Sequence, residues 1–411
     1  MSRVYHLFEV FGVELEYMVV DRDGLDVLPL TDEVLKAAAG DYVSEVERDS
    51  LAWSNELVLH VIELKTNGPA ASLAGLAQLF QASAREIDRI LEPRGGRLMP
   101  GGMHPWMDPW RETRLWPHEY SAVYTTLDRI FDCRGHGWSN LQSLHMNLPF
   151  SGDEEFGRLH SAIRLVMPLM PGLAAASPVM DGRLTGLADS RLEVYRDNQK
   201  RIPSITGRVI PEPVFTEQEY REKILAPMYA DIEPWDPEGV LRHEWLNSRG
   251  AIARFQRDTI EVRVLDVQEC PQADLAIYAL IVAVLRALTQ ERWPGGERQH
   301  WTFPTDRLAA VLDAAIRDGG AAWIEDRSYL RLFGLDPDRP MTANALWREL
   351  LERVGPELES GDAQTAGRLL AGGTLAERLQ RALGPAPGRD RLEREYRRLA
   401  DCLAEGTLFD A

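Results

Sequence analysis

Four segments of the chain alternate apolar and polar side chains with the period of a β-strand. They cover residues 10–21, 57–66, 141–149 and 259–267, and each is rich in valine, leucine, isoleucine or aromatic residues. Seven segments have the period of an amphipathic helix: residues 72–91, 153–170, 217–229, 272–288, 306–317, 363–383 and 389–403. Because strands and helices do not alternate regularly, the pattern favours an α+β fold over a doubly wound parallel sheet.

The pattern changes near Pro294, after which the chain is predicted to be almost wholly helical. We expect a soft boundary there, with residues 1–293 as one domain and residues 294–411 as a helical C-terminal region, either separate or part of the same domain. Residues 174–213 are rich in glycine, proline, aspartate and arginine. A loop of this length is either a functional lid or a plain exposed excursion.

Strand alternation gathers ionisable side chains on one face of the predicted sheet. In the segment GVELEY, Val13, Leu15 and Tyr17 point to one side, whereas Glu14 and Glu16 point to the other. The two carboxylates then stand about 7 Å apart. A single pair of this kind is more often a solvated strand face, so it needs partners on other strands.

Two other strands repeat this division into an apolar and a polar face. Glu261 and Arg263 share the polar face of TIEVRVLDVQ. His145 and Asn147 share the polar face of SLHMNLPF. Three strands therefore combine an apolar face with ionisable groups, which favours a functional surface over three unrelated solvated faces.

The segment NELVLHVIELKT adds Glu56 and Glu63, but their positions have opposite parity. An unbroken strand would send the two side chains to opposite faces. Three interpretations remain: Glu56 lies in a turn around Ser54 and Asn55 before the strand starts, a bulge separates the pair, or one of them is a surface residue.

Composition limits the classes of partner. The chain has 411 residues, of which 45% are hydrophobic, and this is enough for a substantial core. Its 64 acidic and 46 basic residues give a net charge of −18, which argues against nucleic acid and anionic membrane surfaces as partners. ATP remains compatible, because bound divalent cations invert the local charge of a carboxylate-rich site.

Cysteine usage and hydropathy indicate the compartment. The three cysteines, at positions 133, 270 and 402, lack the spacing of a zinc site or a disulfide framework. No apolar run reaches the length needed to span a bilayer, and the N-terminal segment lacks the apolar core of a signal peptide. We expect a cytoplasmic protein with no membrane segment, and leave open whether it forms a homo-oligomer.

The polar face suits a particular chemistry. Carboxylate oxygens are the ligands that Mg²⁺ prefers, and Mg²⁺ commonly bridges protein carboxylates to substrate phosphates. A planar guanidinium suits a phosphoryl group held beside the metals.

The motifs GVELEY, NELVLHVIE, HMN and EVRVLDVQ, in this order, resemble the glutamate–cysteine ligase family, particularly its bacterial carboxylate–amine ligase branch. That family is related to glutamine synthetase. The resemblance covers residues 11–288, and the helical C-terminal third does not share it. It implies a glutamine-synthetase-like antiparallel sheet with helices on its outer face.

The resemblance also implies a role for each matching residue. Glu16, Glu56 and Glu63 would bind one Mg²⁺, with Mn²⁺ as an alternative ion, and Glu14, His145 and Glu261 would bind a second that touches the ATP phosphates. Arg263, with Glu261, would be catalytic, and Arg263 would also contact ATP. Arg191, in the segment SPVMDGRLTGLADSR, would bind a substrate carboxylate or phosphate, and Asn147 and Gln142 would orient the acceptor carboxylate.

One basic segment, HEWLNSRGAIARFQRD, leaves two interpretations open. Its arginines, Arg254 among them, either line the ATP or carboxylate pocket or balance an acidic surface.

The implied activity is ATP- and Mg²⁺-dependent joining of a small-molecule or peptide carboxylate to an amine through an acyl phosphate. Two rivals are a guanidino-kinase-like phosphotransferase and a non-catalytic homologue that binds a nucleotide or other ligand. Phosphotransferases of that kind rely on arginines around the phosphates, whereas six of the seven matched positions here are metal-ligand types. A non-catalytic homologue is expected to lose at least one ligand, and none is missing.

Overall fold

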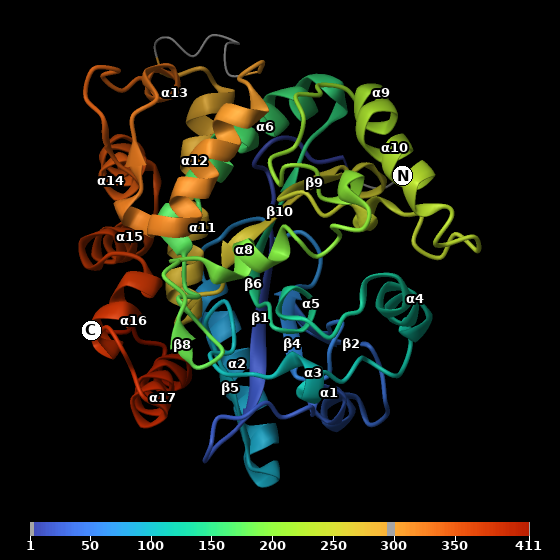
Figure 1. Cartoon of the computed structure of the whole chain (residues 1–411). Helices are drawn as coiled ribbons and strands as arrows, with labels where there is room; N and C mark the ends of the chain where they lie inside the picture. Colours follow the sequence, from blue (N-terminus) through green and yellow to red (C-terminus); the bar gives the residue numbers. More distant parts are fainter. Residues whose placement is uncertain (1–3, 294–300, 411) are drawn as a thin grey trace.

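The protein is built around one antiparallel sheet (Figure 1), and the computed structural model describes residues 4–293 and 301–410. The strand order is β2-β3-β4-β1-β6-β10-β9, and β5 pairs with the C-terminal half of β1. The strands of this sheet are β1 (Gly12–Asp21), β2 (Glu45–Arg48), β3 (Leu51–Asn55), β4 (Val61–Thr66), β5 (Gly96–Met99), β6 (Ser143–Pro149), β9 (Ala251–Arg254) and β10 (Thr259–Asp266). Two-residue strands form two small antiparallel pairs: β7 (Val179–Met180) with β8 (Arg183–Leu184), and β11 (Trp323–Ile324) with β12 (Met341–Thr342).

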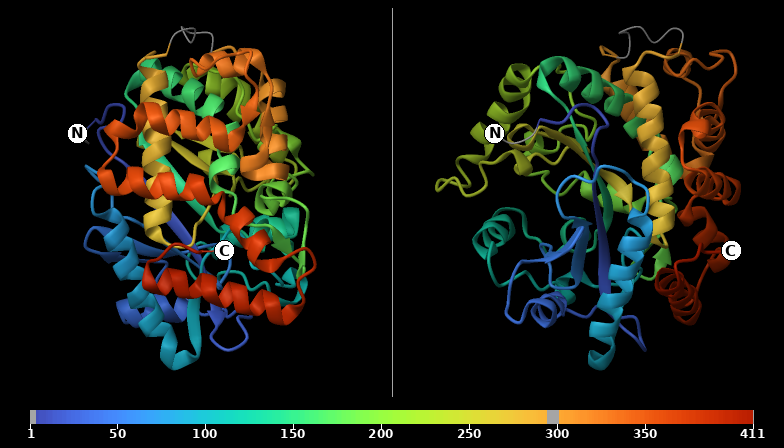
Figure 2. Two further views of the ribbon diagram at one scale, coloured as in Figure 1. Left: turned by 90° about the vertical axis from the view of Figure 1, so that its left-hand side faces the viewer. Right: turned by 180° about the vertical axis from the view of Figure 1, so that it is seen from behind.

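Helices cover the apolar face of this sheet, and other helices lie outside them. The helices are α1 (Thr31–Ala39), α2 (Leu76–Leu91), α3 (Pro109–Glu112), α4 (Ser121–Phe131), α5 (His136–Ser139), α6 (Gly152–Val166), α7 (Pro171–Ala174), α8 (Ser190–Tyr195), α9 (Glu217–Tyr220), α10 (Ala226–Ile232), α11 (Pro271–Thr289), α12 (Thr305–Asp318), α13 (Arg327–Leu332), α14 (Ala343–Val354), α15 (Ser360–Gly372), α16 (Leu375–Leu383) and α17 (Arg389–Glu405). Figure 2 shows α2 and α11 against one side of the strands, with the C-terminal helices as a further layer. The predicted α+β class is confirmed.

The alternation in β1 explains which face the helices cover. Val13, Leu15 and Tyr17 are fully buried and belong to the main core together with residues of α2, α6 and α11. The hydroxyl of Tyr278, on α11, donates to the carbonyl oxygen of Gly12 at 3.1 Å, which holds this helix against the middle of the sheet. The opposite face is left for the polar side chains.

Helix α11 is mostly apolar, with a mean hydropathy of 1.6, and by length and composition alone it could cross a bilayer. In this structure, 89% of the 18-residue segment of the helix over which the hydropathy is averaged is buried inside the protein. Burial against the sheet and its neighbouring helices accounts for the apolar composition, as is usual for the central helix of a core.

The C-terminal helices continue the same core. Buried side chains of α12, α14 and α15, such as Leu308, Trp347 and Leu370, belong to the hydrophobic cluster that contains the sheet residues. Of these helices, α14 and α15 pack on α11, whereas α12 packs on α7 and α8. All three leave the polar face of the sheet uncovered. The boundary expected at residue 294 lies outside the described residues, so a division at that point remains a proposal.

Two expected elements differ from the observed ones. The strand predicted for residues 57–66 begins only at Val61, and a separate strand, β3, precedes it. The turn between them was missed because Leu57, Val58 and Leu59 continue the apolar pattern. The helix predicted for residues 363–383 is two helices that break at Gly373, which has a φ of 85°, a backbone conformation that favours glycine.

Candidate active site

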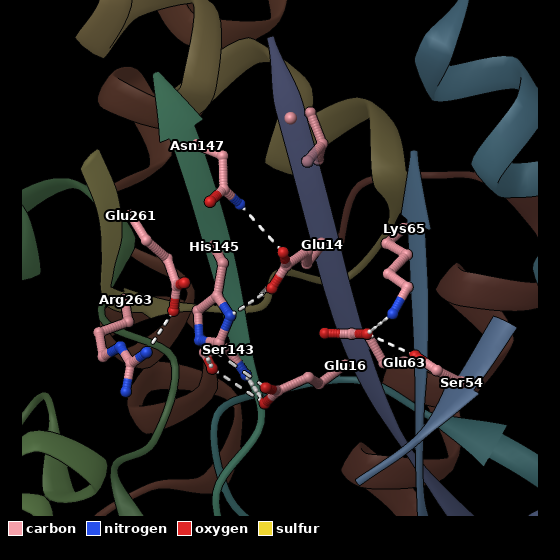
Figure 3. A network of polar contacts seen from close by, with 12 residues as sticks. Glu14, Glu16, Ser54, Glu63, Lys65, Ser143, His145, Asn147, Glu261 and Arg263 are labelled. Carbon is pink, nitrogen blue, oxygen red and sulfur yellow. Dashed lines mark hydrogen bonds and ion pairs between the residues drawn. The ribbon is translucent and has the colours of Figure 1, made fainter. Parts of the chain in front are cut away.

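The polar residues of three neighbouring strands meet on the uncovered face of the sheet (Figure 3). Glu14 on β1 lies opposite His145 on β6, and Asn147 on β6 lies opposite Glu261 on β10. The His145 Nδ1 and Glu14 Oε2 atoms are 2.8 Å apart, and the Asn147 side-chain amide donates to Glu14 Oε1 at 3.0 Å. Strand pairing therefore brings these groups into direct contact, as the alternation of the sequence indicated.

Glu16 and Glu63 face each other across β1 and β4. Glu16 Oε2 accepts hydrogen bonds from the backbone N–H and the hydroxyl of Ser143, at 2.7 and 2.9 Å. Glu63 Oε2 accepts from the Ser54 hydroxyl at 2.5 Å and lies 3.1 Å from Lys65 Nζ. Both carboxylates are buried, with exposures of 6%, so these fixed donors hold them inside the protein.

The parity problem of Glu56 and Glu63 has a simple solution. Glu56 directly follows the end of β3, and Glu63 lies inside β4, so no single strand contains both. The turn falls after Glu56 instead of before it, and both side chains line the same pocket.

Glu261 forms the other side of the site. Its two carboxylate oxygens pair with different arginines: Arg254 at 2.9 Å, and Arg263, with which it forms a close hydrogen bond. Burial would raise the pKa of Glu261, but Arg263 and then His145 and Arg254 outweigh it and lower that pKa. Glu261 is therefore held in its ionised form.

All these groups except Asn147 and Ser54 open into one pocket of about 460 Å³. It is lined by Glu14, Glu16, Glu56, Leu57, Val58, Val61, Glu63, Lys65, Tyr124, Leu127, Gly137, Trp138, Leu141, Ser143, His145, Arg191, Tyr195, Asn198, Gln199, Trp245, Leu246, Ser248, Arg254, Arg257, Glu261 and Arg263. The arginine-rich segment before β10 thus contributes Arg254 and Arg257 to the pocket. Arg249 of the same segment points elsewhere, since its guanidinium binds Glu212.

The crowded carboxylates perturb one another. Burial, followed by the charge of Glu14, raises the pKa of Glu63 to about 7. Burial, followed by the charges of Glu16 and Glu63, raises the pKa of Glu56 well above its usual range. Glu14, like Glu261, differs from these two, because the hydrogen bond and charge of His145 outweigh burial and lower its pKa to about 2. A divalent cation would relieve the remaining repulsion.

The donor atoms closest to one another belong to Glu14, Glu63 and His145, each of which has a ligand atom within 4.8 Å of the others. Two carboxylates and an imidazole are a donor set that suits Mg²⁺ or Mn²⁺. This trio combines ligands from both of the expected metal sites. Glu63 comes from the expected site of Glu16, Glu56 and Glu63, whereas Glu14 and His145 come from the expected site of Glu14, His145 and Glu261. The groups are thus close enough for a ligand to be shared between two ions.

The Glu14–His145 pair predicts how the metal-free protein responds to pH. Burial alone would lower the pKa of His145, but its hydrogen bond to Glu14 and the nearby carboxylate charges outweigh it and raise the pKa from 6.5 to about 9. Between pH 6.5 and about 9, His145 therefore carries a proton in the folded protein that it loses in the unfolded chain. We therefore expect the free energy of unfolding to decrease as pH rises from about 6.5 to 9.

Urea unfolding with a chelator present, followed across this range, measures the effect. His145→Asn should make the free energy of unfolding depend less on pH in this range. The matched variant His118→Asn, at an ion pair with Asp32 outside the pocket, should keep the dependence of the unchanged protein. An unaltered slope in His145→Asn would contradict the assignment.

The structure places two expected substrate contacts outside the pocket lining. Gln142 is fully buried, and its backbone N–H donates to Gly102 at 3.0 Å. Asn147 holds the Glu14 carboxylate. Neither residue lines the pocket, so Gln142 is not retained as a substrate contact and Asn147 becomes a positioning residue.

A bulge in β10 explains why the sequence pattern did not place Asp266 on the same side of the sheet as the site. The register of β10 against β6 shifts between Val262 and Leu265, a stretch that contains Arg263. Continued alternation would turn Asp266 to the apolar face. After the shift, Asp266 lies opposite Ser143 and faces the same side as the site.

Asp266 anchors the segment that carries Arg191. Its Oδ1 accepts from Arg191 Nε at 2.5 Å, and its Oδ2 accepts from Ala176 N and the Ser177 hydroxyl at 2.7 and 2.8 Å. The Arg191 terminal nitrogens lie 3.4 and 3.5 Å from the carbonyl oxygen of Arg263. Arg191, expected to contact substrate, borders the pocket, but its guanidinium is bound to the protein.

The chain is similar to several known proteins. The sequence model of glutamate–cysteine ligase family 2 (GCS2) matches residues 10–389. An uncharacterised protein of Archaeoglobus fulgidus is 36% identical over 310 residues, which cover 75% of this chain and 80% of that protein. A protein of Ectopseudomonas mendocina, provisionally named glutamate–cysteine ligase 2, is 25% identical over 361 residues, which cover 86% of this chain and 83% of that protein.

Solved structures show the same fold. The bifunctional glutathione synthetase of Pasteurella multocida has a TM-score of 0.63 at 15% identity, over 97% of this chain and 53% of that one, so this chain spans about half of its length. The glutamate–cysteine ligase of Francisella tularensis, solved in complex with AMP, has a TM-score of 0.61 at 13% identity, over 96% of this chain and 89% of that one.

Proposed function

We propose that this chain, which belongs to glutamate–cysteine ligase family 2, is an ATP- and Mg²⁺-dependent ligase that joins a carboxylate to an amine. The observation that carries the proposal is the pocket itself. It collects the carboxylates of three strands and one adjoining turn, one imidazole and the arginine pair around Glu261 on a single sheet face. Its substrates would be small-molecule or peptide carboxylates and amines in the cytoplasm.

The donor set fits divalent cations, with Glu14, Glu63 and His145 as the closest trio and Glu16, Glu56 and Glu261 around it. Bound Mg²⁺ would supply positive charge beside the ATP phosphates. The protein's own part is to fix these donors through Asn147, Ser143 and Ser54. Donors held in this way cannot turn away from the site when the phosphates enter.

In the first step, a carboxylate oxygen of the substrate attacks the γ-phosphorus of ATP. The bond from that phosphorus to the β,γ-bridging oxygen breaks, which gives an acyl phosphate and ADP. Arg263 would donate its planar N–H groups to the transferring phosphoryl group, where negative charge is spread over the equatorial oxygens. Glu261 holds Arg263 in place.

In the second step, the amine nitrogen attacks the acyl carbon and the carbon–oxygen bond to phosphate breaks. Inorganic phosphate leaves, and the proton lost by the amine passes to a base or to water. Water must be kept from the acyl phosphate until the amine arrives. Residues of α4, α5 and α8, which form walls of the pocket, are placed to do this.

The test is the release of ADP and phosphate by the purified protein with ATP, Mg²⁺ and a panel of carboxylates and amines that includes glutamate and cysteine. We expect ADP release that needs ATP, Mg²⁺ and both other substrates, with the amide identified by mass spectrometry. Chelation of the metal should abolish it. Transfer of phosphate to a guanidino compound without amide formation would favour a phosphotransferase instead, and no release with any pair would refute the ligase.

A further inference from the structure

Tyr195 lines the pocket, but its hydroxyl has no partner that explains its position. It is the last residue of α8, and it borders the pocket together with Arg263. The hydroxyl oxygen is buried, and within residues 4–293 and 301–410 it forms no hydrogen bond of regular geometry. Buried polar groups in folded proteins are nearly always hydrogen-bonded, because an unbonded one destabilises the fold. This hydroxyl is therefore a candidate for a contact with a ligand.

Arg263 is the charged neighbour of this hydroxyl. Burial would lower the pKa of Arg263, but the charge of Glu261 and then Tyr195 outweigh burial and raise it. A guanidinium group has only donors. The Tyr195 oxygen can accept from Arg263, but its O–H group cannot donate to that side chain. The O–H group therefore needs an acceptor elsewhere.

The carboxylates on the same strand are already engaged. Both oxygens of Glu261 accept from arginines, and both oxygens of Asp266 accept from the segment that carries Arg191. The Nε–H of Arg263 is also buried and, among the described residues, forms no hydrogen bond of regular geometry. Two neighbouring donors, one neutral and one cationic, suit an anion that presents two oxygens.

Helix α8 fixes the direction of Tyr195. Arg191 lies four residues earlier, so the two side chains share one face of the helix. The Arg191 guanidinium is bound to Asp266 and to the carbonyl oxygen of Arg263, which docks this face on β10. The carboxylate of Asp189 caps the start of the helix by accepting from a backbone N–H of its first turn at 2.8 Å. The Tyr195 hydroxyl is thus held beside Arg263 before any ligand binds.

We propose that Tyr195 is a further catalytic residue of the first step, in which its hydroxyl donates a hydrogen bond to an oxygen of the transferring phosphoryl group, next to Arg263. The proton stays on Tyr195, so the only bonds that form and break are those of the phosphoryl transfer. Negative charge is spread over the equatorial oxygens of that group during transfer, and a donor fixed in advance stabilises it there. This inference rests on the proposed ligase activity.

The first test removes the hydroxyl and keeps the ring. With ATP, Mg²⁺ and the best substrate pair, Tyr195→Phe should lower kcat by about 10²-fold, the scale seen when one preorganised donor is lost. The KM for ATP should stay within about 3-fold. If Tyr195→Phe instead raises the KM for ATP or for the carboxylate and leaves kcat unchanged, the hydroxyl binds a ground state and the inference is wrong.

The matched control is Tyr42→Phe. Tyr42 is exposed, and its hydroxyl donates to Glu33 at 2.6 Å, outside the pocket lining. The same chemical change there should leave kcat and the KM for ATP within about 2-fold. If Tyr195→Phe does not fold, Tyr195→Met also lacks the hydroxyl, and its flexible side chain adapts to irregular packing.

A double variant tests whether the two donors act on the same group. In an Arg263→Lys background, Tyr195→Phe should lower kcat by less than about 10-fold, because residues that act as a unit do not contribute independently. A full loss of about 10²-fold in that background would mean that Tyr195 acts elsewhere, and would overturn the inference.

A binding measurement separates failure of this inference from failure of the ligase reaction, because it needs no turnover. ADP with Mg²⁺ and aluminium fluoride imitates the transferring phosphoryl group. By calorimetry, the unchanged protein should bind this mixture at least about 10²-fold more tightly than ADP with Mg²⁺ alone. Tyr195→Phe should lose about 10-fold or more of that gain and bind ADP as before. The same gain in both proteins, or no gain in either, overturns the inference.

Discussion

Glu14→Gln and Glu261→Gln are each expected to lower kcat by about 10³-fold, the scale seen when one preorganised electrostatic group is removed from an active site. Glutamine has nearly the same shape as glutamate but lacks the charge and one acceptor. Glu14→Gln would weaken both the contact to His145 and the donor set for the metal, and Glu261→Gln would leave Arg254 and Arg263 without their shared partner. Steady-state ADP release at saturating substrates measures the effect.

The matched control is Glu154→Gln. Glu154 forms an exposed ion pair with Arg158 on α6, away from the pocket, and its replacement should leave kcat within about 2-fold, since exposed pairs contribute little. Circular dichroism and thermal unfolding would show whether the three variants fold alike. Near-normal turnover in both pocket variants would rule out the proposed metal and phosphate roles.

Arg263→Lys is expected to lower kcat by about 10³-fold or more, with a smaller change in the KM for ATP. Lysine keeps the positive charge but not the planar fork that contacts two phosphoryl oxygens at once. The Arg263 guanidinium is preorganised, because its terminal nitrogen donates to Glu261. The backbone carbonyl oxygen of Arg263 accepts from Arg191, which holds the strand at this position. Pre-steady-state measurement of acyl-phosphate formation would assign the loss to the first step.

Arg158→Lys serves as the control for this substitution, because it makes the same chemical change at a surface ion pair. Its kcat should not change measurably. If Arg263→Lys is as active as Arg158→Lys, Arg263 does not stabilise the transferring phosphoryl group, and Arg254 would be the residue to examine next.

The β-strand pattern predicted much of the site because side-chain direction in a strand is a local property. Alternation alone placed Glu14 and Glu16 on the polar face of their strand. It likewise placed His145, and Glu261 with Arg263, on the polar faces of theirs. The register that puts Glu14 opposite His145 depends on how strands distant in sequence pair, so it was not predicted. The family resemblance supplied Glu56, which strand parity could not.

Where the structure differs from the sequence-based expectations, the difference comes from tertiary packing, which the local sequence pattern does not encode. The turn between β3 and β4 contains apolar residues that pack under the pocket, so its composition resembled that of a strand. Gln142 lies outside the pocket lining because a polar residue just before a strand can face the interior, and only packing decides this. The role of Arg191 depended on Asp266, a partner 75 residues away in sequence.

The bulge in β10 has a mechanical consequence. Within the bulge the strand presents Arg263 to the pocket, and directly after it Asp266 binds Ala176, Ser177 and Arg191. A displacement of the segment that carries these three residues would therefore be transmitted through a single strand to the guanidinium, with no need for the rest of the sheet to move. Because β10 also carries Glu261, a movement of the segment from Ala176 to Arg191 would shift Glu261 and Arg263 together.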